Sequence, residues 1–204
     1  MILSSCMTKI ENKKMKNKGK LFVISGSSGV GKGTLVSRIL KKNPEIKLSI
    51  STTTRLPRAG EEEGVNYFFV SKEQFKEQIK NNEFFEWAEF ADNFYGTSRK
   101  TVENSLNQGG SIILEIDVQG AFQVKEKCPD AILIFILPPS IIELKNRLIN
   151  RKTETSDIIE KRMGMVEKEL SQKDKFDYQI INDDLEKATI DLQNIINLER
   201  GIKC

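Results

Sequence analysis

Short apolar runs alternate with amphipathic segments over most of the chain. Lys20–Ser25 is an apolar run that ends in glycines, which predicts a buried strand, and Gly31–Leu40 then has apolar residues at helical spacing. The alternation continues further along. Strands are predicted at Ser111–Asp117, Ala131–Leu137 and Tyr178–Ile181, and helices at Thr101–Leu106, Ile141–Asn150, Ile158–Leu170 and Asp184–Leu198. Because consecutive apolar residues suit strands buried on both faces, this order predicts a parallel α/β core.

One stretch, at about 51–101, interrupts the alternation. Residues 51–70 are rich in Thr, Arg, Gly and Glu and end on Tyr67–Val70, so irregular chain and short β elements are expected there. Ser71 is placed as the N-cap of a helix that runs to about Lys80. We therefore expect a core built from residues 20–50 and 102–204, with an insertion at 51–101.

Composition narrows the classes of chemistry. The chain has 204 residues, of which 38% are hydrophobic, and this suits one globular domain with a sizeable core. It contains no histidine, and its three cysteines, Cys6, Cys128 and Cys204, lie far apart. A disulfide scaffold, a zinc site and a Ser-His-Asp triad are therefore excluded or disfavoured.

The net charge of +3 is concentrated at one end of the sequence. Residues 1–20 carry a local charge of +5 and the rest of the chain −2, which argues against nucleic acid as a partner. Residues 1–19, rich in Lys and Asn, are expected to be a disordered basic tail. No apolar run approaches the ~20 residues of a membrane span, and no secretory signal is visible, so we expect a cytoplasmic protein with no membrane partner.

The main chemical motif lies between the first predicted strand and helix. It comprises Gly26, Ser27, Ser28, Gly29, Val30, Gly31, Lys32, Gly33 and Thr34. Glycines let backbone N–H groups curl around phosphate oxygens, the helix N-terminus favours an anion, and Lys32 supplies a mobile positive charge. The alternative, a glycine-rich turn with an exposed lysine, is less favoured in this context. The motif predicts a P-loop that binds the phosphates of a nucleotide.

The residue after the P-loop lysine departs from the usual pattern. A Ser or Thr commonly ligates Mg²⁺ there, whereas this chain has Gly33. We therefore expect no direct protein ligand for Mg²⁺, which would be held mainly by the nucleotide and by water. Glu115 and Asp117, at the end of a predicted strand, are candidates for ordering those waters, and Thr34 for contacting a phosphate.

A second polar cluster predicts a second phosphate site. Arg55 and Arg58 are three residues apart, with a proline between them and glycines nearby, in a segment too polar for the core. Two guanidinium groups in this arrangement can grip a phosphate dianion, and the hydroxyls of Tyr67 and Tyr95 could add donors. Taken without the P-loop, these residues would be interpreted as solvated surface charge.

Several motifs in the same order resemble the guanylate kinase family over about residues 20–200. They are Ser-Gly-Ser-Ser-Gly-Val-Gly-Lys-Gly-Thr at 25–34, Ser-Thr-Thr-Thr-Arg-Leu-Pro-Arg-Ala-Gly-Glu at 51–61, Asn-Asn-Glu-Phe-Phe-Glu-Trp-Ala-Glu-Phe at 81–90, Tyr-Gly-Thr-Ser at 95–98, Leu-Glu-Ile-Asp-Val-Gln-Gly at 114–120 and Arg-Lys-Thr-Glu-Thr at 151–155. The resemblance implies an α/β P-loop nucleoside monophosphate kinase fold. In this fold helices flank a parallel sheet core, a mixed α/β region that binds GMP is inserted, and a mobile helical lid lies at about 139–165.

The same resemblance implies roles for individual residues. Arg55, Arg58, Tyr67 and Tyr95 would hold the GMP phosphate, while Ser51, Glu86 and Thr97 would read guanine. Arg147, Arg151 and Arg162 would converge with Arg58 on the transferring phosphate, and Asn182 would lie on the adenine side. Glu86 has a plainer alternative as a solvated acid near the start of a Trp-containing strand.

The expected reaction is transfer of the γ-phosphoryl group from ATP to GMP, and to dGMP, with Mg²⁺. It needs no His or Cys nucleophile, because positioning and charge neutralisation carry phosphoryl transfer. Two alternatives stay open at this point: a P-loop kinase acting on another phosphorylated acceptor, and a guanylate-kinase-like module that binds proteins without catalysis. Whether the chain is a monomer or a homo-oligomer is also open.

Overall fold

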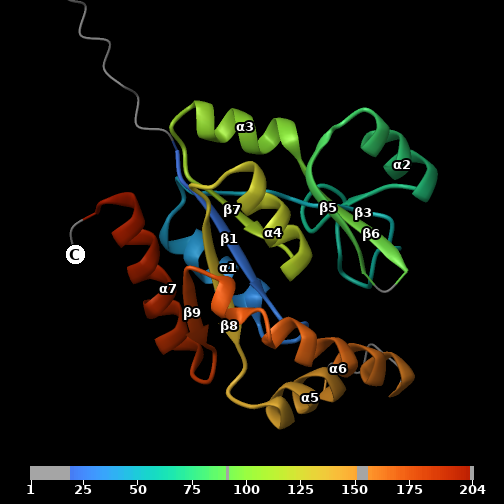
Figure 1. Cartoon of the computed structure of the whole chain (residues 1–204), viewed down its shortest axis with the longest axis vertical. Coiled ribbons are helices and arrows are strands. Elements are labelled where there is room, and N and C mark those ends of the chain that lie inside the picture. The colour runs from blue at the N-terminus through green and yellow to red at the C-terminus, as the bar shows by residue number, and fades with distance from the viewer. Residues whose placement is uncertain (1–18, 91, 151–155, 203–204) are drawn as a thin grey trace, which may run out of the picture.

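A computed structural model describes residues 19–90, 92–150 and 156–202. Its core is a sheet of five strands, all paired in parallel, in the order β2-β7-β1-β8-β9 (Figure 1). The strands are β1 (Leu21–Gly26), β2 (Lys47–Leu48), β7 (Ile112–Glu115), β8 (Ile132–Leu137) and β9 (Tyr178–Ile181). The predicted parallel α/β core is confirmed.

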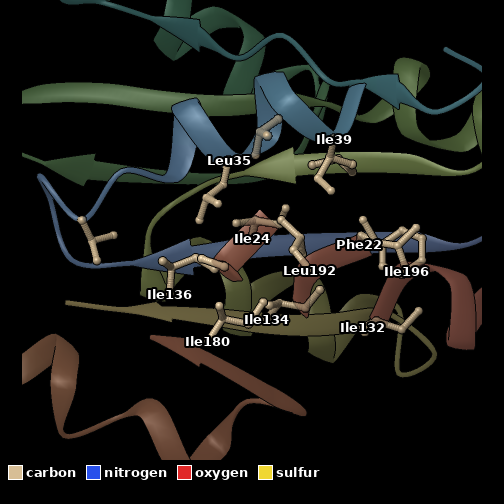
Figure 2. Packing of buried hydrophobic residues seen from close by; sticks show 14 of the residues in the cluster. Phe22, Ile24, Leu35, Ile39, Ile132, Ile134, Ile136, Ile180, Leu192 and Ile196 are labelled. Carbon is tan, nitrogen blue, oxygen red and sulfur yellow. The ribbon is translucent and has the colours of Figure 1, made fainter. Parts of the chain in front are cut away.

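Helices cover both faces of this sheet. Alternate residues of the strands point to opposite faces, so Phe22 and Ile24 pack against α1 (Lys32–Lys42) and α7 (Leu185–Arg200), as Figure 2 shows. Leu21 and Val23 pack on the other side, against α3 (Arg99–Asn107) and α4 (Val118–Lys127). The P-loop therefore leaves a strand that is fixed from both sides.

A pair of neutral amide side chains also joins α1 to α7. Asn43, which ends α1, donates from Nδ2 to Gln193 Oε1 at 2.7 Å and accepts from Gln193 Nε2 at 3.1 Å. The same Asn43 amide donates to Ile39 O at 2.8 Å, and Asn43 is buried. Two exposed ion pairs, from Arg38 and Lys42 to Glu186, lie along the same helix contact.

A second sheet lies beside the core, within residues 51–101. Its strands are β3 (Thr52–Thr53), β4 (Phe68–Phe69), β5 (Phe84–Phe90) and β6 (Asn93–Ser98), in the order β4-β3-β6-β5, with β5 at the edge. The helix α2 (Lys72–Lys80) begins at Ser71, whose side chain accepts from Gln74 N in a capping box, as the N-cap prediction expected. β5 and β6 form an antiparallel pair, and Phe85 is an extra residue in β5 that makes a β-bulge.

Two helices form a pair that projects from the core. α5 (Ile141–Asn150) and α6 (Ser156–Leu170) contact one another, and a 3₁₀ turn, η1 (Lys173–Lys175), leads from α6 toward β9. Residues 139–165, expected as a lid, span α5 and the first ten residues of α6, and their residues 151–155 lie outside the described part of the chain. Of residues 1–19, expected as a tail, residues 1–18 lie outside the described residues. Among the described residues, no helix is both long and apolar enough to cross a membrane.

The segment after β7 differs from the prediction. The strand ends at Glu115, two residues earlier than expected, and Asp117 is the N-cap of α4, which the sequence analysis did not predict. The Asp117 side chain accepts from Gly120 N at 2.8 Å, and this satisfies one of the free N–H groups of the first turn. The turn to a helix here brings α4 against β5.

Candidate active site

One cavity of about 240 Å³ lies where the core and the second sheet meet, at the carboxyl ends of β1 and β7, where open α/β sheets bind their ligands. Most of the predicted site residues line it together: Gly26, Ser28, Gly29, Gly31, Lys32, Gly33, Ser51, Arg55, Arg58, Tyr67, Glu86, Tyr95, Glu115 and Asp117. Ser27, Val30, Thr34, Thr97 and Asn182 do not line it. Two polar sites that are separate in the sequence thus face a common space.

Three glycines of the P-loop hold backbone angles that side chains rarely adopt. Gly26, Gly29 and Gly31 have φ values of 141°, 89° and 96°. A Cβ on Gly26 would overlap the carbonyl oxygen of Ile136 in the neighbouring strand β8. α1 begins directly after this loop, so its N-terminus and the free N–H groups there face the cavity and favour an anion.

The side chain of Lys32 curls back over the loop. Its Nζ donates to Gly26 O at 2.5 Å and to Ser27 O at 3.2 Å. Asn182 supports the loop from behind, because its Nδ2 donates to Val30 O at 2.8 Å and its side chain is buried. Asn182 thus contacts the P-loop backbone; its predicted adenine contact stays a prediction.

Glu61 organises the loop that carries the two arginines. Its carboxylate accepts from Arg55 Nη2 at 2.8 and 2.9 Å, and from Arg58 N at 2.7 Å. The Arg55 guanidinium lies 5.4 Å from the ring centre of Tyr67, and the Tyr67 ring meets the Tyr95 ring edge-on at 6.2 Å. These contacts bring two cations and two phenol rings to one wall of the cavity.

Glu86 is a buried carboxyl with one hydroxyl partner. It is 3% exposed, so its interpretation as a solvated acid is wrong. Thr97, its cross-strand neighbour on β6, donates from Oγ1 to Glu86 Oε1 at 2.5 Å. Burial raises the pKa of Glu86 to about 7, and the hydrogen bond from Thr97 opposes that rise. Thr97 thus holds the carboxyl from behind, although it does not itself line the cavity.

Three further acids line the same cavity as Lys32. Glu115 faces the first turn of α1, since a Cβ on Gly33 would lie 3.4 Å from Glu115 Oε2. Burial raises the pKa of Asp117, and Lys32 acts in the opposite direction. The same two effects act on the pKa of Glu169, which lines the cavity from the end of α6. Glu169 was not predicted, because it follows two other charged residues, Glu167 and Lys168, and nothing in the sequence distinguishes it from them. Only the packing of α6 brings it to the cavity.

The structure does not describe the side chains of the three arginines predicted in the lid segment. Arg147 and Arg162 belong to α5 and α6, but their side chains lie outside the described part of the structure, and Arg151 lies outside the described residues altogether. No group of three or more Asp, Glu, Cys or His that could hold a metal ion occurs among residues 19–90, 92–150 and 156–202.

Comparison with known proteins shows the family. A family model described as guanylate kinase matches residues 18–199. A guanylate kinase of Clostridioides difficile (strain 630) is 49% identical over 184 residues, which cover 90% of each chain. One from Synechococcus sp. (strain JA-3-3Ab) is 49% identical over 179 residues, 88% of this chain and 82% of the relative.

Solved structures agree with this assignment. The crystal structure of guanylate kinase from Anaplasma phagocytophilum matches with a TM-score of 0.77 at 35% identity, covering 90% of this chain and 87% of that one. A shikimate kinase from Bacteroides thetaiotaomicron matches at a TM-score of 0.50 and 13% identity, covering 87% and 98%, and so shares the fold alone. With a family match over nearly all of the core and relatives of this similarity, the chain belongs to the guanylate kinase family.

Proposed function

We propose that this protein transfers the γ-phosphoryl group of ATP to GMP, and to dGMP, giving ADP and GDP. The observation that carries the proposal is the shared cavity, which is lined by the P-loop, by the loop with Arg55 and Arg58 and by the buried Glu86 carboxyl. A donor and an acceptor phosphate bound by these residues would lie within one shared cavity.

ATP would bind with its phosphates in the P-loop. The backbone N–H groups of residues 26–34 and the N-terminus of α1 would hold the phosphate oxygens, and Lys32 would leave the carbonyls of Gly26 and Ser27 to reach the transferring group. Asn182 and Thr34 are the remaining contacts proposed on this side.

GMP would bind across the cavity. Arg55, Arg58, Tyr67 and Tyr95 would hold its phosphate, because two guanidinium groups and two phenol hydroxyls that line one cavity supply donors for a phosphate dianion. Guanine presents its N1–H and N2–H₂ donors side by side, and one ionised carboxylate accepts both, so Glu86 would read this edge. Ser51 and Thr97 would complete the guanine site.

The chain's residues would act by position and charge. The GMP phosphate is itself the nucleophile and needs no strong general base, so the transfer is direct and in line, with no covalent enzyme intermediate. Lys32, Arg58 and the three arginines of the expected lid segment 139–165, Arg147, Arg151 and Arg162, would neutralise charge on the transferring group. Closure of residues 139–165 over the site would exclude water, which would otherwise accept the phosphoryl group.

The acids around the P-loop fit a Mg²⁺ ion held through water. Gly33 has no hydroxyl to ligate the ion, but Glu115 faces that position and Asp117 lines the same cavity. Mg²⁺ prefers an octahedral set of oxygens, keeps several waters and is bound largely by nucleotide phosphates. Glu115 and Asp117 would accept hydrogen bonds from those waters, and the ion would supply charge neutralisation between the phosphates.

An ADP-release assay over a panel of nucleoside monophosphates tests the proposal. We expect ADP release with GMP and dGMP that exceeds release with AMP, CMP or UMP by at least tenfold. Release with a different acceptor would favour another P-loop kinase, and no release with any acceptor would favour a protein-binding module. Both substrates are small cytoplasmic metabolites, and the cytoplasm is the proposed location.

A further inference from the structure

One face of α4 packs along the strand that carries Glu86. Gly120, Gln123 and Lys127 are spaced three and four residues apart, so they lie on the same side of the helix. β5 is the last strand of its sheet, and the backbone groups on its outer side have no neighbouring strand to pair with. α4 occupies that side.

Two of the three side chains bind the backbone on either side of Glu86. The Gln123 amide pairs with Trp87 as a strand would, because its Nε2 donates to Trp87 O at 2.7 Å and its Oε1 accepts from Trp87 N at 3.3 Å. Lys127 Nζ donates to Phe85 O at 2.6 Å. Both chain neighbours of the buried carboxyl are thus held by one helix.

The third residue makes space for the carboxyl itself. A Cβ on Gly120 would overlap Glu86 Oε2 and lie 3.1 Å from Glu86 Cδ. Any residue with a side chain at position 120 would therefore push the carboxyl away from α4. The N–H of Gly120 is already used by Asp117 Oδ1, so the backbone of this turn cannot easily shift to relieve the overlap.

The bulge at Phe85 explains why the strand needs this support. Phe84 and Glu86 pair with the adjacent residues Ser98 and Thr97 of β6, so Phe85 has no partner of its own in the ladder. The extra residue re-aims the chain, so that Phe85 packs in the core while Glu86 lines the cavity. A bulge leaves backbone groups unpaired, and the carbonyl of Phe85 is the one that Lys127 binds.

We propose that Gly120, Gln123 and Lys127 are positioning residues that set the specificity for guanine by fixing where the Glu86 carboxyl lies. The proposal rests on the proposed function and names the device by which that site discriminates among purines. A two-point hydrogen bond to N1–H and N2–H₂ is lost when the carboxylate moves by about 1 Å, and misplacement on that scale costs up to ~10²-fold in rate.

Two side-chain substitutions test the proposal against a purely structural role. Gln123→Leu and Lys127→Met remove the hydrogen bonds while keeping most of the side-chain size. Lys125→Met is the matched control, since Lys125 lies on the same helix and donates to Ala131 O at 2.8 Å and to Asp177, away from Glu86. The substrates are GMP and IMP, because IMP keeps N1–H and lacks the 2-amino group.

We expect both variants to lower kcat/KM for GMP about tenfold, chiefly through KM, and for IMP by much less, so that the GMP over IMP ratio falls several-fold. The KM for ATP should stay within twofold, and Lys127→Arg should restore the ratio. Lys125→Met should lower Tm and leave the ratio unchanged. If Gln123→Leu does not fold, the exposed Lys127 carries the test alone.

Gly120→Ala provides a second line of test. Alanine in a helix is more favourable than glycine by roughly 1 kcal/mol, and Gly164→Ala, at an exposed helical position with nothing within 4 Å, measures that gain alone. We expect Gly120→Ala to show none of this gain in the free energy of unfolding, and to lower the ratio of kcat/KM for GMP to kcat/KM for IMP. An unchanged GMP over IMP ratio in Gln123→Leu, Lys127→Met and Gly120→Ala would overturn the proposal. A parent enzyme that is inactive with GMP would instead overturn the proposed function.

Discussion

Thr97 Oγ1 donates a 2.5 Å hydrogen bond to Glu86 Oε1 across the antiparallel pair of β6 and β5. The hydroxyl has no acidic proton to give up at neutral pH, so it fixes one carboxylate oxygen without neutralising the charge. A buried carboxyl held in this way by a neutral donor is suited to accept hydrogen bonds from a ligand.

Glu86→Ala should lower kcat/KM for GMP at least tenfold and leave the KM for ATP nearly unchanged. The reason is that a bidentate contact to a base discriminates by ~1–3 kcal/mol, and Glu86 lies on β5, outside the P-loop that would bind ATP. Steady-state kinetics with GMP and AMP check this. An unchanged preference for GMP over AMP would show that guanine is read elsewhere.

The pKa of Glu86, about 7 in the ligand-free protein, predicts a pH dependence of GMP binding. The ionised form accepts both guanine donors, so the KM for GMP should rise as pH falls from 8 to 6, and binding near pH 7 should release a proton. Calorimetry in buffers of different ionisation enthalpy measures that release. Glu86→Gln should bind GMP weakly with no such pH dependence.

The same shift predicts the pH dependence of stability. The folded-state pKa of Glu86 is raised above the ordinary value of 4.5, so the folded state binds the proton more tightly than the unfolded state. This contribution to stability is complete below pH 4.5 and is lost as pH rises through about 7. As pH falls from 8 to 5, the Tm of the parent should therefore rise relative to the Tm of Glu86→Gln. A Tm difference that does not change with pH would contradict the assignment of this pKa to Glu86.

Lys32→Ala should lower kcat at least ~10²-fold, the effect expected when one preorganised donor to a developing charge is removed. The loop itself should persist, because its glycine angles and the contact from Asn182 do not depend on the lysine. Kinetics with ATP and GMP, with Tm as the control, test this. Activity within a few-fold of the parent would contradict the P-loop assignment.

Arg151→Ala and Arg162→Ala should reduce kcat more than they weaken GMP binding. The family resemblance assigns these arginines to contacts made only when the site is closed, and contacts made only in the transition state affect kcat. Single-turnover rates and GMP titrations separate the two effects. An unchanged kcat with a raised KM for GMP would instead place them in ground-state binding.

Gly33→Ser should lower the Mg²⁺ concentration for half-maximal activity several-fold. The added Cβ would stand at ordinary contact distance, 3.4 Å from Glu115 Oε2, and its hydroxyl would offer the ion a direct oxygen ligand. Gly33→Ala, which adds the carbon without the oxygen, is the control in a Mg²⁺ titration at fixed ATP. Equal Mg²⁺ curves for the two variants would count against a water-held ion at this position.

The sequence predicted the local features of the fold well. The P-loop can be recognised in the sequence because Gly26, Gly29 and Gly31 stand at positions whose positive φ favours glycine. In addition, the predicted strand, loop and helix follow one another directly. Arg55 and Arg58 are found for the same reason, since three residues of one loop fix their separation. Local spacing therefore predicted two groups of residues that the structure brings to one cavity.

Features that depend on packing between distant segments were missed. α4 begins with Asp117 as its N-cap, but the apolar run before it was extended through Asp117 as strand, and Gly120 weakened the helical pattern. The bulge at Phe85 shifts the register of β5 by one residue, which no alternation of apolar residues indicates. Glu169 faces the cavity only because of how α6 docks.

The amide pair between Asn43 and Gln193 bears on how the nucleotide site responds to ionic strength. Salt screens the exposed ion pairs of Arg38 and Lys42 with Glu186, and it competes with phosphate at the other end of α1. The hydrogen bonds between the two uncharged amides are not screened in this way. The C-terminal end of α1 therefore stays bound to α7 at high ionic strength. High salt should weaken nucleotide binding at the P-loop without displacing the helix that follows the loop.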